Sequence, residues 1–407
     1  MLYYAERNLE KCMHCGSCEE IVACLGNCIC CVENCFGCGA CKLACPYEAI
    51  EMKERKESRK VLIKIDGEKF SVPERITVKR ALEIVGYKIG KFPGEGDLFA
   101  PCEVGGCYCC AVEVDGEVKP SCVTGVREGM EIKTEISESY ATKRLLHGWT
   151  GHPVGGVGTP WWLKGYKVVE VAVFACGCNY RCPQCQNWTT TYNGKEIALT
   201  PREAAFIMTS VRKSYGVDRM AISGGESTLN RKWLVQYLKE LKKLNPDEKA
   251  RLHVDTNASI LTPDYIDELV EAGMTDIGPD LKGLYLETFM KITGLKDKEL
   301  AEKFHKTSWK AVKYIVDNYR DKVFLGVGIP YNRDFISLEE LYEIGTEICR
   351  IDSEIQVCVL DYRPEFRNRK ISRPSFKEMV NVWKILRSCG LKTVVCQTVF
   401  GHIGPEL

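Results

Sequence analysis

Cys178-Asn179-Tyr180-Arg181-Cys182-Pro183-Gln184-Cys185 carries three cysteines at C-x3-C-x2-C spacing, directly after the apolar run from Val168 to Ala175. The apolar run predicts a β-strand, which places the three thiols on a tight loop at its end. Three thiolates on one loop can hold three corners of a cubane iron–sulfur cluster, and the fourth iron stays open to a substrate or cofactor. Zinc is the alternative, because Cys176 supplies a fourth thiol nearby.

The composition limits the class of protein. The chain has 407 residues, 45% of them apolar and 27% charged, which is enough for two or three domains with buried cores. Its 56 basic and 55 acidic residues nearly cancel, so we expect neither a nucleic-acid partner nor a membrane surface. The first residues show no signal-peptide core, and no apolar run reaches about 18 residues, so we expect a cytoplasmic protein. The 24 cysteines cluster at short spacings, which indicates metal sites in a reducing, anaerobic cytosol.

Residues 1 to 57 are predicted to form a ferredoxin-like domain with two [4Fe-4S] clusters. Cys35-x2-Cys38-x2-Cys41-x3-Cys45-Pro46 is the bacterial ferredoxin run, and Cys12-x2-Cys15-x2-Cys18 repeats its first three ligands. The fourth cysteine of such a run ligates the other cluster. One centre is therefore predicted on Cys12, Cys15, Cys18 and Cys45. The second is predicted on Cys35, Cys38, Cys41 and Cys24, with Cys28, Cys30 and Cys31 as alternatives to Cys24. A zinc module is the competing interpretation.

Residues 58 to 135 show a second iron–sulfur pattern. Alternating apolar residues around Asp66-Gly67 and around Asp115-Gly116 predict two hairpins, and Thr77 to Val85 has helical spacing. The plant-type spacing C-x4-C-x2-C…C, which ligates [2Fe-2S], occurs at Cys102, Cys107, Cys110 and Cys122. Cys109 falls between the ligands as a spectator. The region resembles the [2Fe-2S] β-grasp modules of iron hydrogenases and of the large iron–sulfur subunit of respiratory complex I.

Residues 136 to 165 are predicted to be a linker. We expect a connecting helix from Ile136 to Leu146, followed by a Gly/Pro-rich segment with two histidines and three tryptophans. These are His147, His152, Trp149, Trp161 and Trp162. Two interpretations stay open: a packed linker that covers an edge of the next domain, which we prefer, or a lid or docking loop for a substrate.

From residue 166 to residue 407, short apolar strands alternate with amphipathic helices. The predicted strands are 168–175, 219–223, 251–256, 275–277, 323–329 and 355–360, and the helices between them include 202–215, 231–244, 263–272 and 338–350. Repeated βα units predict an α/β partial TIM barrel of about six units, with function at the C-terminal strand ends.

Distinctive motifs follow four of these strands. In Ser223-Gly224-Gly225-Glu226-Ser227-Thr228, the glycines let the backbone approach a ligand and Glu226 can accept from an ammonium group. Asp255-Thr256-Asn257 suits a ribose or a carboxylate. Asp280-Leu281-Lys282 places a carboxylate and an ammonium group at alternate positions, with a surface salt bridge as the alternative. Gly326-Val327-Gly328 is flat enough for a stacked base.

These motifs in this order resemble the radical S-adenosylmethionine (radical SAM) superfamily over about residues 166 to 400. The resemblance implies that Cys178, Cys182 and Cys185 hold a third [4Fe-4S] cluster, whose open iron binds SAM. One electron then breaks a carbon–sulfur bond, and a 5'-deoxyadenosyl radical abstracts hydrogen. It also implies that Gly224, Gly225 and Glu226 hold the methionine amino group. Asp255 and Asn257 lie near the nucleoside, and Asp280 with Lys282 meets the carboxylate or orients the substrate. Ser227 and Gly328 complete the expected SAM site.

Within the superfamily, the barrel motifs look most like those of glycyl-radical-enzyme activases. Ser227 stands where proline is usual in those enzymes, and Asp361-Tyr362-Arg363-Pro364 stands where they have histidine. The resemblance to activases implies a radical SAM enzyme that acts on a polypeptide. The alternatives are a small-metabolite enzyme and a non-catalytic electron-transfer subunit. The upstream clusters would carry electrons from a low-potential donor such as ferredoxin.

Overall fold

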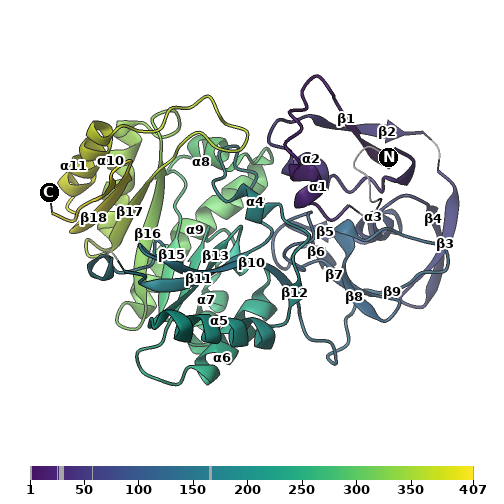
Figure 1. The fold of residues 1–407 in the computed structure, drawn as a ribbon, viewed down its shortest axis with the longest axis horizontal. Coiled ribbons are helices and arrows are strands. Elements are labelled where there is room, and N and C mark those ends of the chain that lie inside the picture. Colours follow the sequence, from purple (N-terminus) through teal and green to yellow (C-terminus); the bar gives the residue numbers. More distant parts are fainter. Residues whose placement is uncertain (1, 25, 27–31, 57, 165–166, 407) are drawn as a thin grey trace. The chain divides into compact units, whose positions relative to one another are not determined.

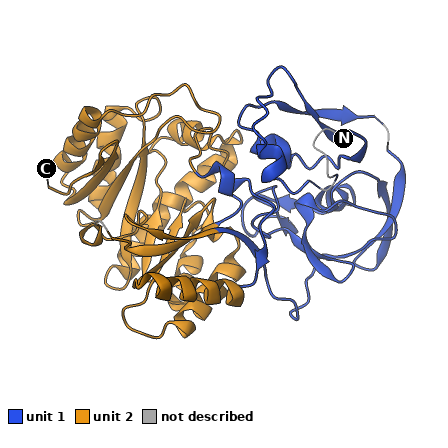
Figure 2. Ribbon diagram, in the orientation of Figure 1, with its two compact units in different colours: residues 1–147, 175–179, 187–200 blue, residues 148–174, 180–186, 201–407 orange. Residues whose placement is uncertain are grey.

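The computed structural model describes residues 2–24, 26, 32–56, 58–164 and 167–406. The chain divides into two compact units (Figure 2). Unit 1 comprises residues 1–147, 175–179 and 187–200, and unit 2 comprises residues 148–174, 180–186 and 201–407. The expected domain limits at residues 57, 165 and 166 lie outside the described residues, so they stay a prediction.

Unit 1 begins with a small antiparallel ribbon of two strands (Figure 1). Strand β1 (Leu2–Arg7) pairs with β2 (Ile50–Arg55), and α1 (Ser17–Glu20), η1 (Val32–Asn34) and α2 (Ala40–Ala44) lie between them in the sequence. Gly16 before α1 and Gly39 before α2 have nearly the same positive φ, 76° and 77°. Each follows the second cysteine of its run. The doubled sequence motif is therefore also a doubled backbone conformation.

A five-stranded sheet forms the second part of unit 1. Its order is β4-β3-β9-β7-β8. The strands are β3 (Lys60–Ile65), β4 (Glu68–Pro73), β7 (Ala111–Val114), β8 (Glu117–Pro120) and β9 (Glu131–Lys133). Both predicted hairpins are present: the Asp66-Gly67 and Asp115-Gly116 turns have positive φ at each residue, which matches the twist of a two-residue hairpin. Helix α3 (Val78–Ile84), capped by Thr77, buries Val78, Ala81 and Leu82 in the core of this sheet.

Three short elements lie in the segments that connect α3, β7, β8 and β9. They are β5 (Ile89–Gly90), β6 (Leu98–Phe99) and η2 (Ser121–Val123).

The helix expected from Ile136 to Leu146 is wrong. This stretch is irregular up to residue 143, and β10 (Arg144–His152) begins where the helix should end. The Ser139 amide donates to the Ser137 hydroxyl at 3.3 Å, a local turn bond that competes with helix formation. Leu145 and Leu146 are both buried, which a strand with two covered faces explains. The start of β10 pairs antiparallel with β12 (Ala198–Leu199), which follows the short helix α4 (Trp188–Thr191).

The sheet of unit 2 runs in the order β10-β11-β13-β14-β15-β16-β17-β18-β19. Its further strands are β11 (Glu170–Ala175), β13 (Arg219–Gly224), β14 (Arg251–Thr256), β15 (Asp276–Pro279), β16 (Phe324–Tyr331), β17 (Gln356–Asp361), β18 (Thr393–Thr398) and β19 (Gly401–Ile403). The pairs from β13 to β18 are parallel, and β19 returns antiparallel. In the part of the chain that the structure describes, no ladder joins β19 back to β10, so the sheet is open.

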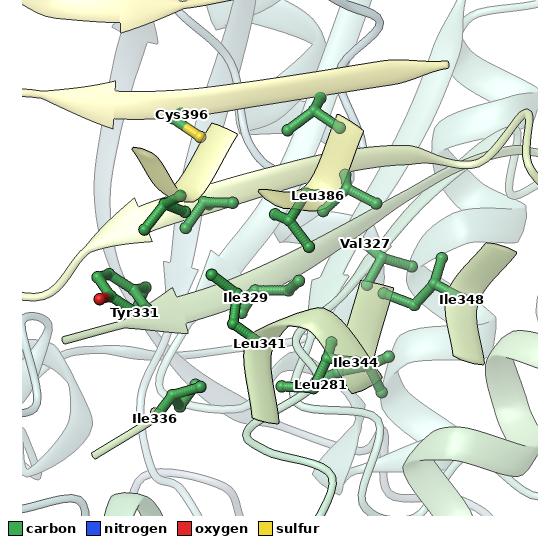
Figure 3. Packing of buried hydrophobic residues seen from close by; sticks show 14 of the residues in the cluster. Leu281, Val327, Ile329, Tyr331, Ile336, Leu341, Ile344, Ile348, Leu386 and Cys396 are labelled. Carbon is green, nitrogen blue, oxygen red and sulfur yellow. The ribbon is translucent and has the colours of Figure 1, made fainter. Parts of the chain in front are cut away.

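Helices connect the parallel strands, as the repeated βα pattern predicts. They are α5 (Pro201–Tyr215), α6 (Arg231–Leu244), α7 (Pro263–Glu271), α8 (Leu286–Thr293), α9 (Lys298–Tyr319), α10 (Leu338–Ile351) and α11 (Phe376–Ser388), and η4 (Ser227–Leu229) follows β13. Figure 3 shows how Val327 and Ile329 of β16 face Leu341, Ile344 and Leu386 of the covering helices. These buried side chains pack the covering helices against β16.

The glycine-rich segment before β11 packs across the strands. A Cβ atom on Gly158 would lie 2.6 Å from the Ile277 carbonyl carbon, and one on Gly326 would collide with the Val157 carbonyl. The Gln356 side-chain amide donates to the Thr159 carbonyl at 2.9 Å and accepts from the Trp161 amide at 2.7 Å, just before η3 (Trp161–Leu163). Residues 157–161 thus pack against strands of unit 2, while the linker assignment of residues 136–165 stays a prediction.

Among the described residues, no helix combines the length and the apolar character that a membrane crossing requires.

Candidate active site and iron–sulfur ligands

The 178–185 cysteine loop follows β11, and its second half is firmly anchored. Cys178 belongs to unit 1 and is buried, whereas Cys182 and Cys185 belong to unit 2 and are partly exposed. Within unit 2, the Arg181 amide donates to the Thr293 carbonyl at 2.9 Å. The Gln184 side chain donates to the Ile292 carbonyl at 2.9 Å. Both acceptors lie in the last turn of α8, where carbonyls lack partners inside the helix.

A turn at residues 365–368 holds the same half of the loop. The amides of Arg367 and Asn368 both donate to the Pro183 carbonyl at 2.9 Å. Phe366 anchors the turn: it is fully buried, and the Arg367 guanidinium lies 4.8 Å from its ring. Sequence reasoning found nothing specific in this arginine-rich stretch, because its contact with the loop is made by backbone groups.

Asp280 and Lys282 form a largely buried ion pair close to Cys182. Lys282 Nζ lies 2.9 Å from Asp280 Oδ2, and Lys282 is only 6% exposed. Burial alone would lower the pKa of Lys282, but Asp280 outweighs it and holds the pKa well above its usual value. Burial raises the pKa of Cys182 to about 12, against the opposing charge of Lys282. The pair is therefore not a surface salt bridge, and it acts electrostatically on a cysteine of the loop.

Gly328 makes room for Asp280. The two residues form an isolated parallel bridge, and a Cβ on Gly328 would collide with Asp280 Oδ1. The sequence predicted that this glycine leaves space for a stacked base. The structure shows the space filled by the Asp280 carboxylate.

The Glu226 carboxylate is buried and already accepts several hydrogen bonds. Oε1 accepts from the Thr228 amide at 3.0 Å and from the Thr228 and Thr256 hydroxyls, each at 2.6 Å. Oε2 accepts from the Asn257 amide at 2.6 Å. A carboxylate offers about four acceptor positions, so these bonds use most of them. Glu226 thus ties the loop after β13 to the loop after β14.

The neighbours of Glu226 reinforce that tie. The Ser227 hydroxyl donates to the Asp255 carbonyl at 2.5 Å, a bond that the usual proline could not make. Gly224 has φ 120°, a conformation that favours glycine, and with Gly225 it leads the chain away from β13. The predicted residues Gly224 to Ser227 and Asp255 to Asn257 are therefore brought together at the ends of neighbouring strands.

Asp255 sits beside a buried histidine that sequence reasoning missed. His253 Nε2 lies 3.0 Å from Asp255 Oδ1, and Nδ1 lies 3.1 Å from Glu170 Oε2. The Nε2 contact lacks hydrogen-bond geometry, so we treat it as a charge contact. Burial alone would lower the pKa of His253, but the two carboxylates outweigh it and raise the pKa to about 10. The signal in the sequence that could have revealed it was a single histidine inside the predicted strand 251–256.

The first predicted set of [4Fe-4S] ligands lines one cavity. Cys12, Cys15, Cys18 and Cys45 all border a space of about 110 Å³ in unit 1. Burial raises the pKa of Cys18, the neighbouring Cys45 adds to the shift, and Arg7 opposes it. The Arg7 guanidinium lies 3.6 Å from Cys18 Sγ.

The second predicted set also gathers in unit 1. Burial raises the pKa of Cys38 to about 11, with further contributions from Cys35 and Cys24. The same two thiols add to the raised pKa of the buried Cys41. Cys24 therefore lies within electrostatic range of the other three. The alternatives Cys28, Cys30 and Cys31 lie outside the described residues.

The predicted [2Fe-2S] thiols converge in the interior of unit 1. Cys102, Cys107, Cys110 and Cys122 are each at most 3% exposed. Hydrogen bonds from Cys107 and Cys122 hold the pKa of Cys102 well below its usual value, although burial opposes this. Cys109 is partly exposed.

No disulfide joins the described cysteines of these sets. In the described ranges, no three His, Cys, Asp or Glu side chains surround one metal position. An iron–sulfur centre spreads its ligands over several irons, so its thiols need not converge on one point. The buried thiols of Cys102, Cys107, Cys110 and Cys122, which contact one another, fit that requirement.

Comparisons with known proteins match three parts of the chain. Residues 173–343 match the Radical SAM superfamily, residues 58–136 a 2Fe-2S iron-sulfur cluster binding domain, and residues 32–51 a 4Fe-4S binding domain. One of the subunits of NADH-quinone oxidoreductase from Mycobacterium tuberculosis is 39% identical over 90 residues, 22% of this chain and 11% of that protein.

The other similarities are also partial. A probable GTP 3',8-cyclase of Methanococcus aeolicus is 30% identical over 117 residues, 29% of this chain and 38% of that protein. The crystal structure of Streptococcus suis SuiB aligns with a TM-score of 0.42 at 17% identity, over 56% of this chain and 49% of that one. The chain thus spans well under two thirds of the proteins it matches.

The sequence match over residues 173–343 coincides with the cysteine loop and the strand-end residues described above. The chain therefore contains a radical SAM domain joined to 2Fe-2S and 4Fe-4S ferredoxin-type domains.

Proposed function

We propose that this chain is a radical SAM enzyme that abstracts hydrogen from a polypeptide, in the manner of a glycyl-radical-enzyme activase. The observation that supports it is the gathering of Cys182, Asp280 and Lys282 in unit 2, with the bonded loops of Glu226 and Asp255 at neighbouring strand ends. A bound [4Fe-4S] cluster would supply one electron to cleave SAM into methionine and a 5'-deoxyadenosyl radical.

The residues of this chain would share the work as follows. Cys178, Cys182 and Cys185 would hold the cluster, and the Lys282 ammonium group, kept charged by Asp280, would attract a carboxylate. Glu226 would keep the strand-end loops in place, because its bonds to Thr256 and Asn257 leave little capacity for another donor. The partial barrel of about six βα units, the β-grasp form of the 58–135 domain and three [4Fe-4S] clusters belong to the same proposal.

A small-molecule substrate is the second candidate. It is favoured by the similarity to the Methanococcus aeolicus protein described as a probable GTP 3',8-cyclase. A non-catalytic electron-transfer subunit is the candidate of another class. For all three, we propose a low-potential donor such as ferredoxin and, from the cysteine-rich composition, a reducing cytoplasm.

The test is anaerobic incubation of the reconstituted protein with SAM and dithionite. We expect 5'-deoxyadenosine and methionine in equal amounts. Deuterium should appear in 5'-deoxyadenosine when a perdeuterated glycyl-radical enzyme is added, and not when deuterated GTP is added. The reverse labelling would favour the small-molecule candidate, and no 5'-deoxyadenosine at all would contradict both.

A further inference from the structure

The start of the cysteine loop packs directly on the loop of the predicted [2Fe-2S] site, within unit 1. The Cys176 amide donates to the Leu145 carbonyl at 3.1 Å, and the Leu145 amide donates to the Gly106 carbonyl at 3.1 Å. A stretch of β10 thus joins the two loops by backbone hydrogen bonds. Gly106 lies between the expected ligands Cys102 and Cys107, and Gly177 precedes Cys178.

Two glycines make this contact as close as backbones allow. A Cβ on Gly177 would lie 2.9 Å from the Cys107 nitrogen, 3.0 Å from Cys102 Cβ and 3.2 Å from Cys102 Sγ. A Cβ on Gly106 would lie 2.7 Å from the Cys176 carbonyl carbon and 2.8 Å from its Cβ. Even a methyl group would therefore have to push the loops apart. Glycine at both positions keeps the Cys102 sulfur next to the residue before Cys178.

The same thiol set also faces the ferredoxin-like part of unit 1. A cavity of about 400 Å³ is bordered by Cys38 of the second [4Fe-4S] set and by Cys122 of the [2Fe-2S] set. Next to it, a Cβ on Gly125 would collide with the ring of Phe36, which follows Cys35. The [2Fe-2S] thiol set therefore shares a cavity with Cys38 through Cys122, and through Cys102 it lies next to the residue before Cys178.

We infer that the [2Fe-2S] centre on Cys102, Cys107, Cys110 and Cys122 is the immediate electron donor to the cluster bound through Cys178, with Gly106 and Gly177 as positioning residues. The inference rests on the proposed function. In the step, one electron leaves the reduced [2Fe-2S] centre, which is oxidised, and enters the [4Fe-4S] cluster, which is reduced. No bond forms or breaks, and a ferredoxin-type donor renews the electron. Closeness matters because electron tunnelling slows steeply with distance.

The first test is magnetic and does not depend on turnover. In dithionite-reduced holoenzyme, the [2Fe-2S] spin should relax faster when the catalytic cluster is present and also reduced. We expect this enhancement in the wild-type protein and its loss in Cys182→Ala, which keeps the other clusters. Equal relaxation of the [2Fe-2S] signal in the two proteins would overturn the inference, whether or not SAM is cleaved.

The second test compares Gly177→Ala with Gly116→Ala. Both glycines have positive φ, 85° and 81°, but a Cβ on Gly116 would meet nothing within 4 Å. Gly177→Ala should weaken the relaxation enhancement and slow 5'-deoxyadenosine formation driven by reduced ferredoxin, while Gly116→Ala changes neither. If Gly177→Ala kept all its clusters and behaved as the wild type in both measurements, the contact would not be the electron path.

Failure of the proposed function has a different signature. Magnetic coupling without any 5'-deoxyadenosine, even with dithionite, would support the placement of the two centres and contradict SAM cleavage. SAM cleavage without magnetic coupling would support the proposed function and contradict the placement of the two centres. A Gly177→Ala protein that does not fold leaves the wild-type and Cys182→Ala comparison to decide.

Discussion

The two halves of the 178–185 cysteine loop are held by different parts of the chain. Residues 175–179 pack with the 102–107 loop of unit 1, where Gly106 and Gly177 have no side chain and the loops come close together. Residues 180–186 are anchored in unit 2 by the end of α8 and by the 365–368 turn. Because the anchors differ, a substitution can alter residues 175–179 without altering residues 180–186, and the reverse also holds. Electron supply and SAM cleavage should therefore respond to separate substitutions.

The largest expected effect comes from the second half of the loop. Cys182→Ala should abolish 5'-deoxyadenosine formation, because it removes a ligand of the only cluster expected to have an open iron. The ferredoxin-type signals in electron paramagnetic resonance should persist. Cys109→Ala is the matched control, since Cys109 is a partly exposed cysteine outside every predicted ligand set. Continued SAM cleavage by Cys182→Ala would place the catalytic centre elsewhere.

The next effect is on iron content. Three [4Fe-4S] clusters and one [2Fe-2S] centre predict about fourteen irons per chain. Cys110→Ala should lose about two irons and the [2Fe-2S] signal, while Cys109→Ala loses none. Iron and sulfide analysis after anaerobic reconstitution measures this. A wild-type value near four irons, or zinc in place of iron, would contradict the multi-cluster assignment.

In unit 2, His253→Gln should destabilise the fold by about 3–5 kcal/mol, because it leaves the buried Glu170 carboxylate and the partly buried Asp255 carboxylate without their shared cation. The folded pKa of about 10 lies above the usual 6.5, so the stabilisation is complete below about pH 6.5 and is lost as the pH rises to about 10.

Urea unfolding of wild type and His253→Gln at several pH values measures this effect. The difference in free energy of unfolding should shrink as the pH rises from 6 toward 10. His402→Gln, at an exposed position, is the control. A difference that is the same at every pH would show that His253 is not charged in the folded protein.

The smallest expected effect concerns the anchor of the second half. Gly294 ends α8 with φ 70°, and a Cβ there would collide with the Arg181 carbonyl. Gly294→Ala should lower the free energy of unfolding by about 1–3 kcal/mol, in addition to the effect of strain in the left-handed conformation. Gly216→Ala carries the same strain, with φ 63° and nothing within 4 Å.

Urea unfolding of the two variants is compared. The difference between their unfolding midpoints reports the contact between Gly294 and the Arg181 carbonyl. We expect Gly294→Ala to unfold at lower urea than Gly216→Ala while its [2Fe-2S] signal stays unchanged. Equal unfolding midpoints would mean that the α8 end does not hold the cysteine loop.

Sequence patterns predicted the elements of both units well where periodicity and turn chemistry agree. Strand β14 and helix α6 begin and end at the predicted residues, and both Asp-Gly hairpins are present. The 136–146 stretch was mistaken for a helix, because its buried leucines belong to a strand whose partners lie far away in the sequence. Strands β18 and β19 extend the sheet beyond the predicted set.

The sequence by itself determined the iron–sulfur character of the chain and the order of its strand-end motifs, because ligand spacing and βα periodicity are local properties. Only the tertiary structure decided how the Glu226 carboxylate is used, which carboxylates surround His253, and what Gly177 touches. These depend on contacts between residues far apart in the chain. Their physical cause is burial: a carboxylate or a backbone group removed from water must find a partner, and only the packed fold shows which one.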